Sequence, residues 1–241
     1  MASHPAFRVT HPPVGWGLAL LLVLLRPVPA GAAREVTFLA PNGRQIRGLM
    51  FDASARPAPA VVLVPMLGGS SDDWRAAGEH FADADITALA IDLPQPSLPA
   101  DAAALAAWHL DVRAALDYLA GRPDIRPGAI GVAGASLGAN LAVLAAVADS
   151  RVRSLALVSP SLDYRGVRIE APMRQYGTRP AFLLASLDDP YAARSVRELV
   201  KDAPGPRETR WAEYPAHGTV LLAREPDLVR ALVEWFQRTL A

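Results

Sequence analysis

Short apolar runs and longer segments of helical period alternate along the chain from residue 35 onward. Five of the runs are almost entirely apolar, as expected of parallel strands whose two faces are both covered by helices. We expect these central strands at residues 61–64, 87–91, 129–133, 155–158 and 182–185. The clearest helical segments are residues 102–119, 137–148 and 226–240. This alternation predicts an α/β fold with a mostly parallel, doubly wound sheet flanked by helices.

Two segments ahead of the central runs predict an antiparallel hairpin at the N-terminal end of the domain. Residues 35–40 and 45–51 flank Pro-Asn-Gly at positions 41–43, which is a turn signal. A further, more polar strand is expected at residues 209–214. No segment has the character of a lid or a second domain, so we expect one domain over residues 33–241.

Composition narrows the class of protein. The chain has 241 residues, of which 51% are hydrophobic, enough to bury one sizeable core. Its 24 basic and 24 acidic residues balance, so it lacks the basic surface that nucleic acid binding needs, and nucleic acid is not an expected partner. The absence of cysteine excludes disulfides, cysteine-zinc sites, iron-sulfur clusters and a thiol nucleophile.

The first 32 residues have the pattern of a secretory signal peptide. Residues 14–25 are apolar for twelve positions, which is too short to span a bilayer comfortably. Arg26 and Pro27 end the run, and Ala-Gly-Ala at positions 30–32 matches the small residues that a signal peptidase accepts. We expect cleavage before Ala33 and an exported, periplasmic or extracellular domain with no stable membrane association. The alternative is an uncleaved N-terminal membrane anchor.

The strand expected to end at residue 133 runs directly into Gly-Ala-Ser-Leu-Gly at positions 134–138, and an alanine-rich helical segment follows. A serine on such a tight strand-to-helix turn needs small neighbours, and the turn lifts its hydroxyl clear of the sheet. The N–H groups at the start of the helix can stabilise developing negative charge. Ser136 is therefore the candidate nucleophile. The alternative is a small-residue turn without chemistry; the glycine spacing fits neither a dinucleotide-binding nor a P-loop motif.

A serine hydroxyl needs a base that accepts its proton. His80 and His109 lie inside helical patterns and are expected to be ordinary surface or packing residues. His217 follows the expected strand at residues 209–214 and precedes Gly218, a loop position of the kind that catalytic residues occupy. His217 is therefore the candidate general base.

The base needs an acid that fixes its tautomer. Asp189 follows the strand expected at residues 182–185 and stands directly before Pro190. Asp188 is its immediate rival, and Asp163, after the preceding strand, is a second one. The order Ser136, Asp189, His217 is that of the α/β-hydrolases rather than of chymotrypsin or subtilisin.

An oxyanion hole needs two preorganised donors. The backbone N–H of Leu137, one residue past the nucleophile, is the natural first donor. The second is expected from the loop after the first central strand, and Leu67 N–H is our candidate, next to paired glycines that allow a sharp turn. The alternative is a plain connection without a catalytic role. Ser159 and Ser161 are expected to be dispensable for bond cleavage.

The chain from about residue 61 to its end resembles the α/β-hydrolase superfamily, and within it the compact, lidless, dienelactone-hydrolase-like branch. The resemblance rests on Gly-Ala-Ser-Leu-Gly-Ala-Asn at 134–140, Asp-Asp-Pro at 188–190 and His-Gly-Thr at 217–219. It implies Asp189 rather than Asp188 as the acid. Two loops depart from the family pattern: residues 65–68 read Pro-Met-Leu-Gly where many relatives begin His-Gly, and residues 93–97 replace a glycine-rich turn. Dienelactone hydrolases carry a cysteine nucleophile, so their substrate is not carried over.

Together these residues predict a serine hydrolase that cleaves an ester or related acyl bond of a small molecule through an acyl-enzyme on Ser136. His217 would act as base and then as acid, with Asp189 orienting it. No metal or organic cofactor is implied. The alternatives are a non-catalytic binding module on the same fold and a peptidase or amidase with the same three residues. Substrate identity and oligomeric state are not specified by the sequence.

Overall fold

The computed structural model describes residues 1, 32–94, 99 and 101–241. The expected leader, apart from Met1 and Ala32, therefore lies outside the described residues, as do residues 95–98 and 100, which include part of the loop at residues 93–97. Within the described ranges, no helix is both long and apolar enough to cross a membrane.

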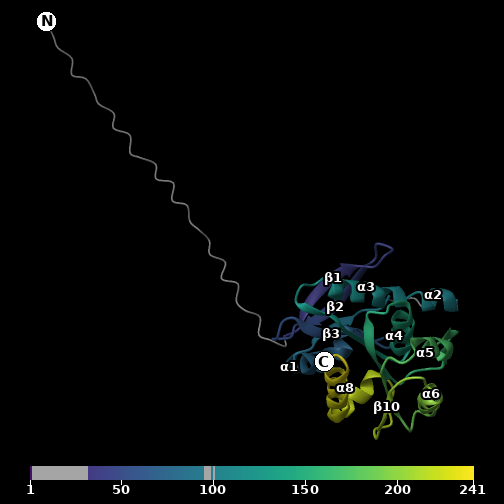
Figure 1. Ribbon diagram of the computed structural model, residues 1–241. Helices are drawn as coiled ribbons and strands as arrows, with labels where there is room; N and C mark the ends of the chain where they lie inside the picture. The colour runs from purple at the N-terminus through teal and green to yellow at the C-terminus, as the bar shows by residue number, and fades with distance from the viewer. Residues whose placement is uncertain (2–31, 95–98, 100) are drawn as a thin grey trace.

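An eight-stranded sheet forms the centre of the molecule (Figure 1). In spatial order its strands are β1 (Arg34–Leu39), β2 (Gln45–Phe51), β4 (Thr87–Ile91), β3 (Ala58–Val64), β5 (Ile125–Ala135), β6 (Val152–Val158), β9 (Ala181–Ser186) and β10 (Arg207–Ala212). The pairs β1–β2 and β2–β4 are antiparallel, and every other neighbouring pair is parallel. The expected fold class, a mostly parallel sheet that opens with an antiparallel hairpin, is confirmed.

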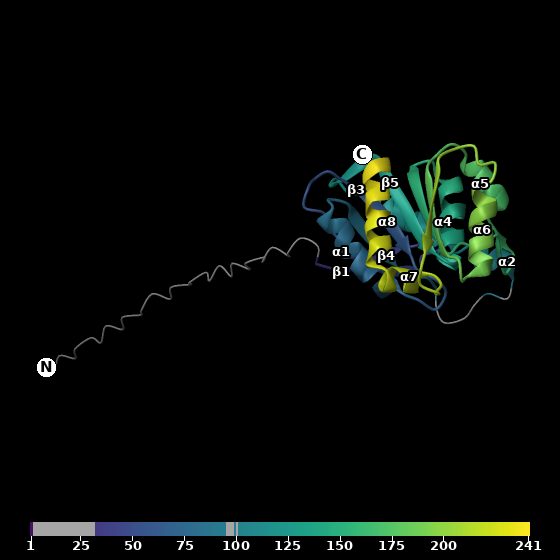
Figure 2. The same cartoon turned by 90° about the horizontal axis from the view of Figure 1, so that it is seen from below.

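Helices cover both faces of the sheet. One face packs against the 3₁₀ helix η1 (Ser71–Trp74), α1 (Arg75–Asp83), α7 (Thr219–Arg224) and α8 (Pro226–Thr239). The other packs against α2 (Ala102–Ala106), α3 (His109–Ala120), α4 (Leu137–Ala148), α5 (Glu170–Tyr176) and α6 (Pro190–Val200). Figure 2 shows α1 and α8 side by side, separated by the sheet from α4, α5 and α6. A short hairpin, β7 (Asp163–Tyr164) and β8 (Val167–Arg168), follows β6.

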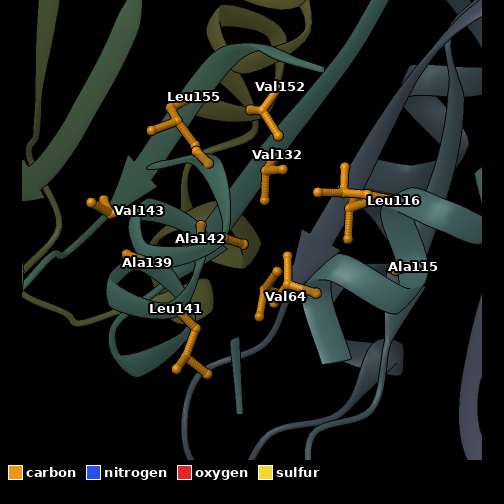
Figure 3. Packing of buried hydrophobic residues seen from close by; sticks show 14 of the residues in the cluster. Val64, Ala115, Leu116, Val132, Ala139, Leu141, Ala142, Val143, Val152 and Leu155 are labelled. Carbon is orange, nitrogen blue, oxygen red and sulfur yellow. The ribbon is translucent and has the colours of Figure 1, made fainter. Parts of the chain in front are cut away.

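The apolar runs form central strands because both of their faces are buried. Successive side chains of a strand point to opposite faces. In β3, accordingly, Val62 and Val64 belong to the core under α3 and α4, while Val61 and Leu63 belong to the core under α1 and α8. Figure 3 shows Val64 among the side chains that α3 and α4 contribute to the first of these cores.

Helix α4 consists almost entirely of apolar residues, because strands and helices cover most of its sides. It contacts β5 and β6 of the sheet and also α3 and α5. Its alanine-rich sequence, buried at nearly every position from Leu137 to Ala146, lets these elements approach closely. The helix following Ser136 is thereby held as a fixed part of the core.

Several strands begin earlier than expected, among them β5 at Ile125 and β6 at Val152, and two further differences have a local cause. The helix expected at residues 102–119 is broken into α2 and α3, so His109 begins a helix instead of lying inside one. The His109 ring bonds the Ala106 carbonyl, and the N–H of Leu110 donates to Ala107 instead. Strand β10 ends at Ala212, two residues earlier than expected. The Tyr214 N–H donates to the side chain of Glu225 and is therefore not part of the strand ladder.

Candidate active site

The candidate catalytic residues gather at the edge of the sheet where the parallel strands end. Ser136 directly follows β5, Asp189 follows β9, and His217 lies in the loop between β10 and α7. Strands β5, β6, β9 and β10 are parallel and adjacent in that order. Their carboxyl ends therefore bring residues far apart in the chain to one place, as open α/β sheets do for their ligand sites.

Ser136, His217 and Asp189 form a continuous hydrogen-bonded chain. The distance from His217 Nε2 to Ser136 Oγ is 2.7 Å, and the distance from His217 Nδ1 to Asp189 Oδ2 is 2.5 Å. With the imidazole proton on Nδ1, the serine hydroxyl donates to Nε2 and Nδ1–H donates to the carboxylate. The His217 side chain is 50% exposed, whereas Ser136 is buried with 8% of its surface accessible, so solvent reaches this hydrogen-bonded chain mainly at the histidine.

The turn that carries Ser136 is held in a left-handed conformation. Ser136 has φ 52° and ψ −120°, in a region that residues other than glycine rarely adopt, and α4 begins at the next residue. A Cβ atom at Gly134 would lie 2.2 Å from the carbonyl oxygen of Gly138. A Cβ atom at Gly138 would lie 2.4 Å from the carbonyl oxygen of Pro65. The flanking glycines of the motif are therefore required by close backbone packing.

Asp189 has two structural roles at once. It is the N-cap of α6, where its Oδ1 accepts a hydrogen bond from Ala192 N–H at 3.1 Å and Pro190 occupies the first turn. Its Oδ2 bonds His217. Because both oxygens have fixed donors, the orientation of the carboxylate against the imidazole is set by the start of the helix.

The two rival aspartates lie elsewhere. Asp188 is exposed, and within the described residues its carboxylate does not contact His217. Asp163 accepts hydrogen bonds from Gly166 N–H at 2.6 Å and from Arg168 Nε at 2.8 Å. The bonded Arg168 guanidinium lowers the pKa of Asp163 below its ordinary value. Of the three carboxylates considered, only that of Asp189 reaches the histidine.

The remaining histidines of the domain serve the helices that carry them. The His80 ring bonds the Ala76 carbonyl at 2.8 Å, and the His109 ring bonds the Ala106 carbonyl at the same distance. Neither ring approaches Ser136 in the described structure. No group of three or more His, Cys, Asp or Glu side chains in the described part of the chain is arranged to hold a metal ion.

The loop after β3 lies beside the start of α4. Residues 66–69 form a turn in which Gly69 N–H donates to the Met66 carbonyl at 3.0 Å and Gly68 has φ 76°, the pattern of a type II turn. Leu67 is the second residue of this turn, and Leu137 is the first residue of α4. Neither the Leu67 N–H nor the Leu137 N–H donates to an acceptor within the described residues. Both remain available to an oxyanion.

A cavity of about 470 Å³ opens beside this loop. Its lining includes Gly68 and Gly69, the hairpin residues Arg44 and Arg47, and Asp92 at the end of β4. Arg47 is largely exposed and forms an ion pair with Asp92 at 3.7 Å, and Arg44 forms an ion pair with a buried aspartate of α3. The two guanidinium groups that line this cavity are therefore each paired with a carboxylate.

One residue that was expected to be dispensable for bond cleavage lies close to His217 at this edge of the sheet. Ser159, at the end of β6, is completely buried, and its Oγ accepts a hydrogen bond from Gly218 N–H at 3.0 Å. Gly218 is the residue after His217. The available signal was that Ser159 follows a strand in the same way as Ser136 does, but the sequence alone does not show that these two strands are neighbours.

Comparison with known proteins supports the fold and gives the family. No curated protein matches the chain. Among solved structures, DcsB, solved with a substrate analogue, is 13% identical with a TM-score of 0.76 over 87% of this chain and 99% of its own. An esterase from Pyrococcus furiosus is 15% identical with a TM-score of 0.71, covering 87% of this chain and 93% of that one. An acetyl xylan esterase from Paenibacillus sp. R4 is 17% identical with a TM-score of 0.68, covering 89% and 87%.

These likenesses confirm the α/β-hydrolase fold that the sequence motifs indicated. The model of the FrsA-like esterase family matches residues 28–164, which is more than half of the chain. The matched region includes Leu67 and Ser136 and ends before Asp189 and His217. The chain belongs to the FrsA-like esterase family.

Proposed function

We propose that this protein is a serine hydrolase that cleaves carboxylic esters of small molecules through an acyl-enzyme on Ser136. The hydrogen-bonded chain from Asp189 through His217 to Ser136 carries the proposal, because it supplies a nucleophile, a base and an orienting acid at hydrogen-bond distances. Membership of an esterase family supports the substrate class.

In the first half of the reaction, Ser136 Oγ attacks the ester carbonyl carbon while His217 Nε2 takes the hydroxyl proton. The carbonyl oxygen becomes an oxyanion, which the N–H groups of Leu137 and Leu67 stabilise. Collapse of the tetrahedral intermediate breaks the bond to the alkoxy oxygen. His217 returns its proton to that oxygen, so an alcohol leaves and the acyl group stays on Ser136.

The second half repeats these steps with water. His217 removes a proton from a water molecule, which attacks the acyl carbon, and the same two N–H groups stabilise the second oxyanion. Collapse releases the carboxylic acid, and the proton returns to Ser136 Oγ. Throughout, Asp189 keeps the proton of the neutral imidazole on Nδ1 and stabilises the imidazolium that forms.

Labelling with a fluorophosphonate tests the proposal, because this probe reacts preferentially with a serine hydroxyl that a nearby base activates. We expect one adduct, located on Ser136 by peptide mass spectrometry, and hydrolysis of p-nitrophenyl acetate. Both should be lost in Ser136→Ala while the circular dichroism spectrum is unchanged. A folded parent protein that forms no adduct and hydrolyses no ester would contradict the proposal and favour a non-catalytic binding module.

A substrate panel distinguishes ester from amide hydrolysis. It consists of p-nitrophenyl esters of increasing acyl length, one ester with a free carboxylate and the p-nitroanilide that matches the best ester. We expect the ester to be cleaved far faster than its anilide. Preference for the anilide or for a peptide would instead support a peptidase or amidase. The anionic ester reports whether Arg44 and Arg47 favour a negatively charged substrate.

We also propose that the domain is exported after removal of residues 1–32, and that it then has no stable association with a membrane. The support is the twelve-residue apolar run at positions 14–25 and the Ala-Gly-Ala site before Ala33. Expression of the full chain in a bacterial host, followed by N-terminal sequencing of the periplasmic and secreted fractions, should give a sequence that starts at Ala33. Recovery of protein with an intact leader in the membrane fraction would contradict cleavage and support the anchor.

A further inference from the structure

We propose that Ser159 is a positioning residue that holds His217 in its reactive orientation by accepting the Gly218 N–H. The inference rests on the proposed function, since it assigns Ser159 a role toward the candidate general base. Ser159 touches neither the substrate nor the serine hydroxyl in this role; it acts through the backbone next to the histidine.

The contact lies directly beside the histidine. Gly218 N–H donates to Ser159 Oγ at 3.0 Å, and both residues are buried. This N–H belongs to the peptide plane that starts at the Cα of His217, so a fixed N–H fixes that plane. Gly218 also packs so closely against Met66 that a Cβ atom on the glycine would lie 2.7 Å from Met66 Sδ. The loop that carries His217 thus contacts both the Ser159 hydroxyl and the Met66 thioether at Gly218.

The hydroxyl stands on a firmly held segment. Ser159 N–H donates to the carbonyl of Leu184 in β9 at 2.7 Å. Two residues later, Ser161 N–H donates to Asn140 Oδ1 at 3.2 Å, and Asn140 Nδ2 donates back to the Ser161 carbonyl at 2.9 Å. The segment is therefore tied to β9, which leads to the acid, and to α4, which follows the nucleophile.

The strained backbone of Ser159 indicates that the folded protein needs its hydroxyl at this position. Its φ of 49° lies in the left-handed region, which glycine adopts without strain and serine does not. Glycine would relieve this strain but would leave the buried N–H of Gly218 without its acceptor, and such an unpaired buried donor is costly. The loop would then relax toward water, where the Gly218 N–H can find another acceptor. This relaxation would move the His217 imidazole away from Ser136 and Asp189.

The variant Ser159→Gly tests this, because it removes the hydroxyl and keeps the backbone free to remain left-handed. Turnover of p-nitrophenyl acetate should fall by about tenfold to a hundredfold, as expected for a displaced catalytic group, and KM should change by less than about twofold. The rate of fluorophosphonate labelling should fall by the same factor as turnover. Ser161→Ala, in the same segment, is the matched control and should keep the parent rates.

A double-mutant cycle separates positioning from general stability. In a His217→Ala background, Ser159→Gly should leave the residual rate unchanged, because the group it positions is absent. An equal loss in both backgrounds would show a merely structural role and overturn the inference. Ser159→Ala, measured in parallel, should act in the same direction and replaces Ser159→Gly should the glycine variant not fold.

The outcome also distinguishes this inference from the proposed function. An active parent whose turnover and labelling are unaffected by both Ser159 variants overturns the role of Ser159 alone. A folded parent that neither hydrolyses the ester nor labels at Ser136 overturns the proposed function and the inference with it.

Discussion

Ser136 and Ser159 occupy equivalent positions at the ends of two paired strands. Ala135, the last residue of β5, is the register partner of Val158, the last residue of β6. Ser136 and Ser159 each come directly after one of these two residues. Ser136 N–H donates to the Val158 carbonyl at 2.9 Å, and the φ angles of the two serines are 52° and 49°. Non-glycine residues in this conformation cost free energy and persist where the surroundings enforce them. Here both stand in the segments that build the candidate active site.

The strain at Ser136 leads to a prediction about stability. Ser136→Gly should be inactive and yet raise the free energy of unfolding by about 1 kcal/mol, because glycine adopts a φ of 52° without strain. Ser136→Ala should be equally inactive without that gain. Urea denaturation of the three proteins checks this. A glycine variant less stable than the alanine variant would show that the turn is not strained.

Exchange of single aspartates for asparagine should separate the acid from its rivals. Asparagine remains a good N-cap, so Asp189→Asn should melt near the parent temperature. Its turnover should fall by about ten-thousandfold, the size of the effect in serine proteases, because the amide favours the wrong tautomer of His217. Asp188→Asn and Asp163→Asn should keep parent turnover in the same assay. Loss of turnover in a folded Asp163→Asn would place the acid on the earlier loop.

The candidate oxyanion donors are backbone groups, so the informative substitution at Leu67 is proline. Proline suits the second position of a type II turn, and it removes the N–H without disturbing the hydrogen bond between Gly69 and Met66. Leu67→Pro should lower turnover by roughly a hundredfold to a thousandfold. Leu67→Ala, which keeps the N–H, is the control and should be mild. Equal turnover of the two variants, both folded by circular dichroism, would reject Leu67 as a donor.

The ion pair between Asp149, which follows α4, and Arg151 should make the stability of the fold depend on pH. Hydrogen bonds from the Arg151 guanidinium lower the pKa of Asp149 below its ordinary 3.8, so the pair stabilises the fold above that pH. The contribution disappears as pH falls through the lowered folded-state pKa. Asp149→Asn should cost about 1 kcal/mol at pH 7, allowing for the partial exposure of Arg151. The melting temperatures of parent and variant should converge at the acid end of a pH series; a constant difference would contradict the ion pair.

Local patterns predicted the local structure well. Strands β2 and β4 and helix α4 have the expected bounds, because each follows from a hydrophobic period and a clear boundary in the sequence. The turn at Ser136 was predictable for the same reason, since the strand, the small residues and the helix are contiguous. The break between α2 and α3 was not predictable in this way, because no sequence signal for a boundary marks it; in the structure the His109 ring bonds the Ala106 carbonyl there.

Relationships across the sheet were harder to predict. The sequence left three aspartates as candidates for the acid, and only the spatial arrangement shows that Asp189 bonds His217 while Asp163 bonds Arg168. Ser159 was expected to be dispensable for bond cleavage, and the sequence does not show that its Oγ bonds Gly218, which is 59 positions away. Hydrophobic periodicity carries no information about such pairs, which arise from the order of the strands.

The strand order also decides when this site comes into existence during folding. Ser136 and His217 are 81 residues apart, and β6 and β9 lie between the strands that lead to them. Helices can form from local contacts, whereas this hydrogen bond requires four parallel strands to be in register, and long-range pairing of that kind is slow. In a refolding experiment, recovery of a reactive Ser136 would therefore lag behind the return of helical signal and report completion of the C-terminal half of the sheet.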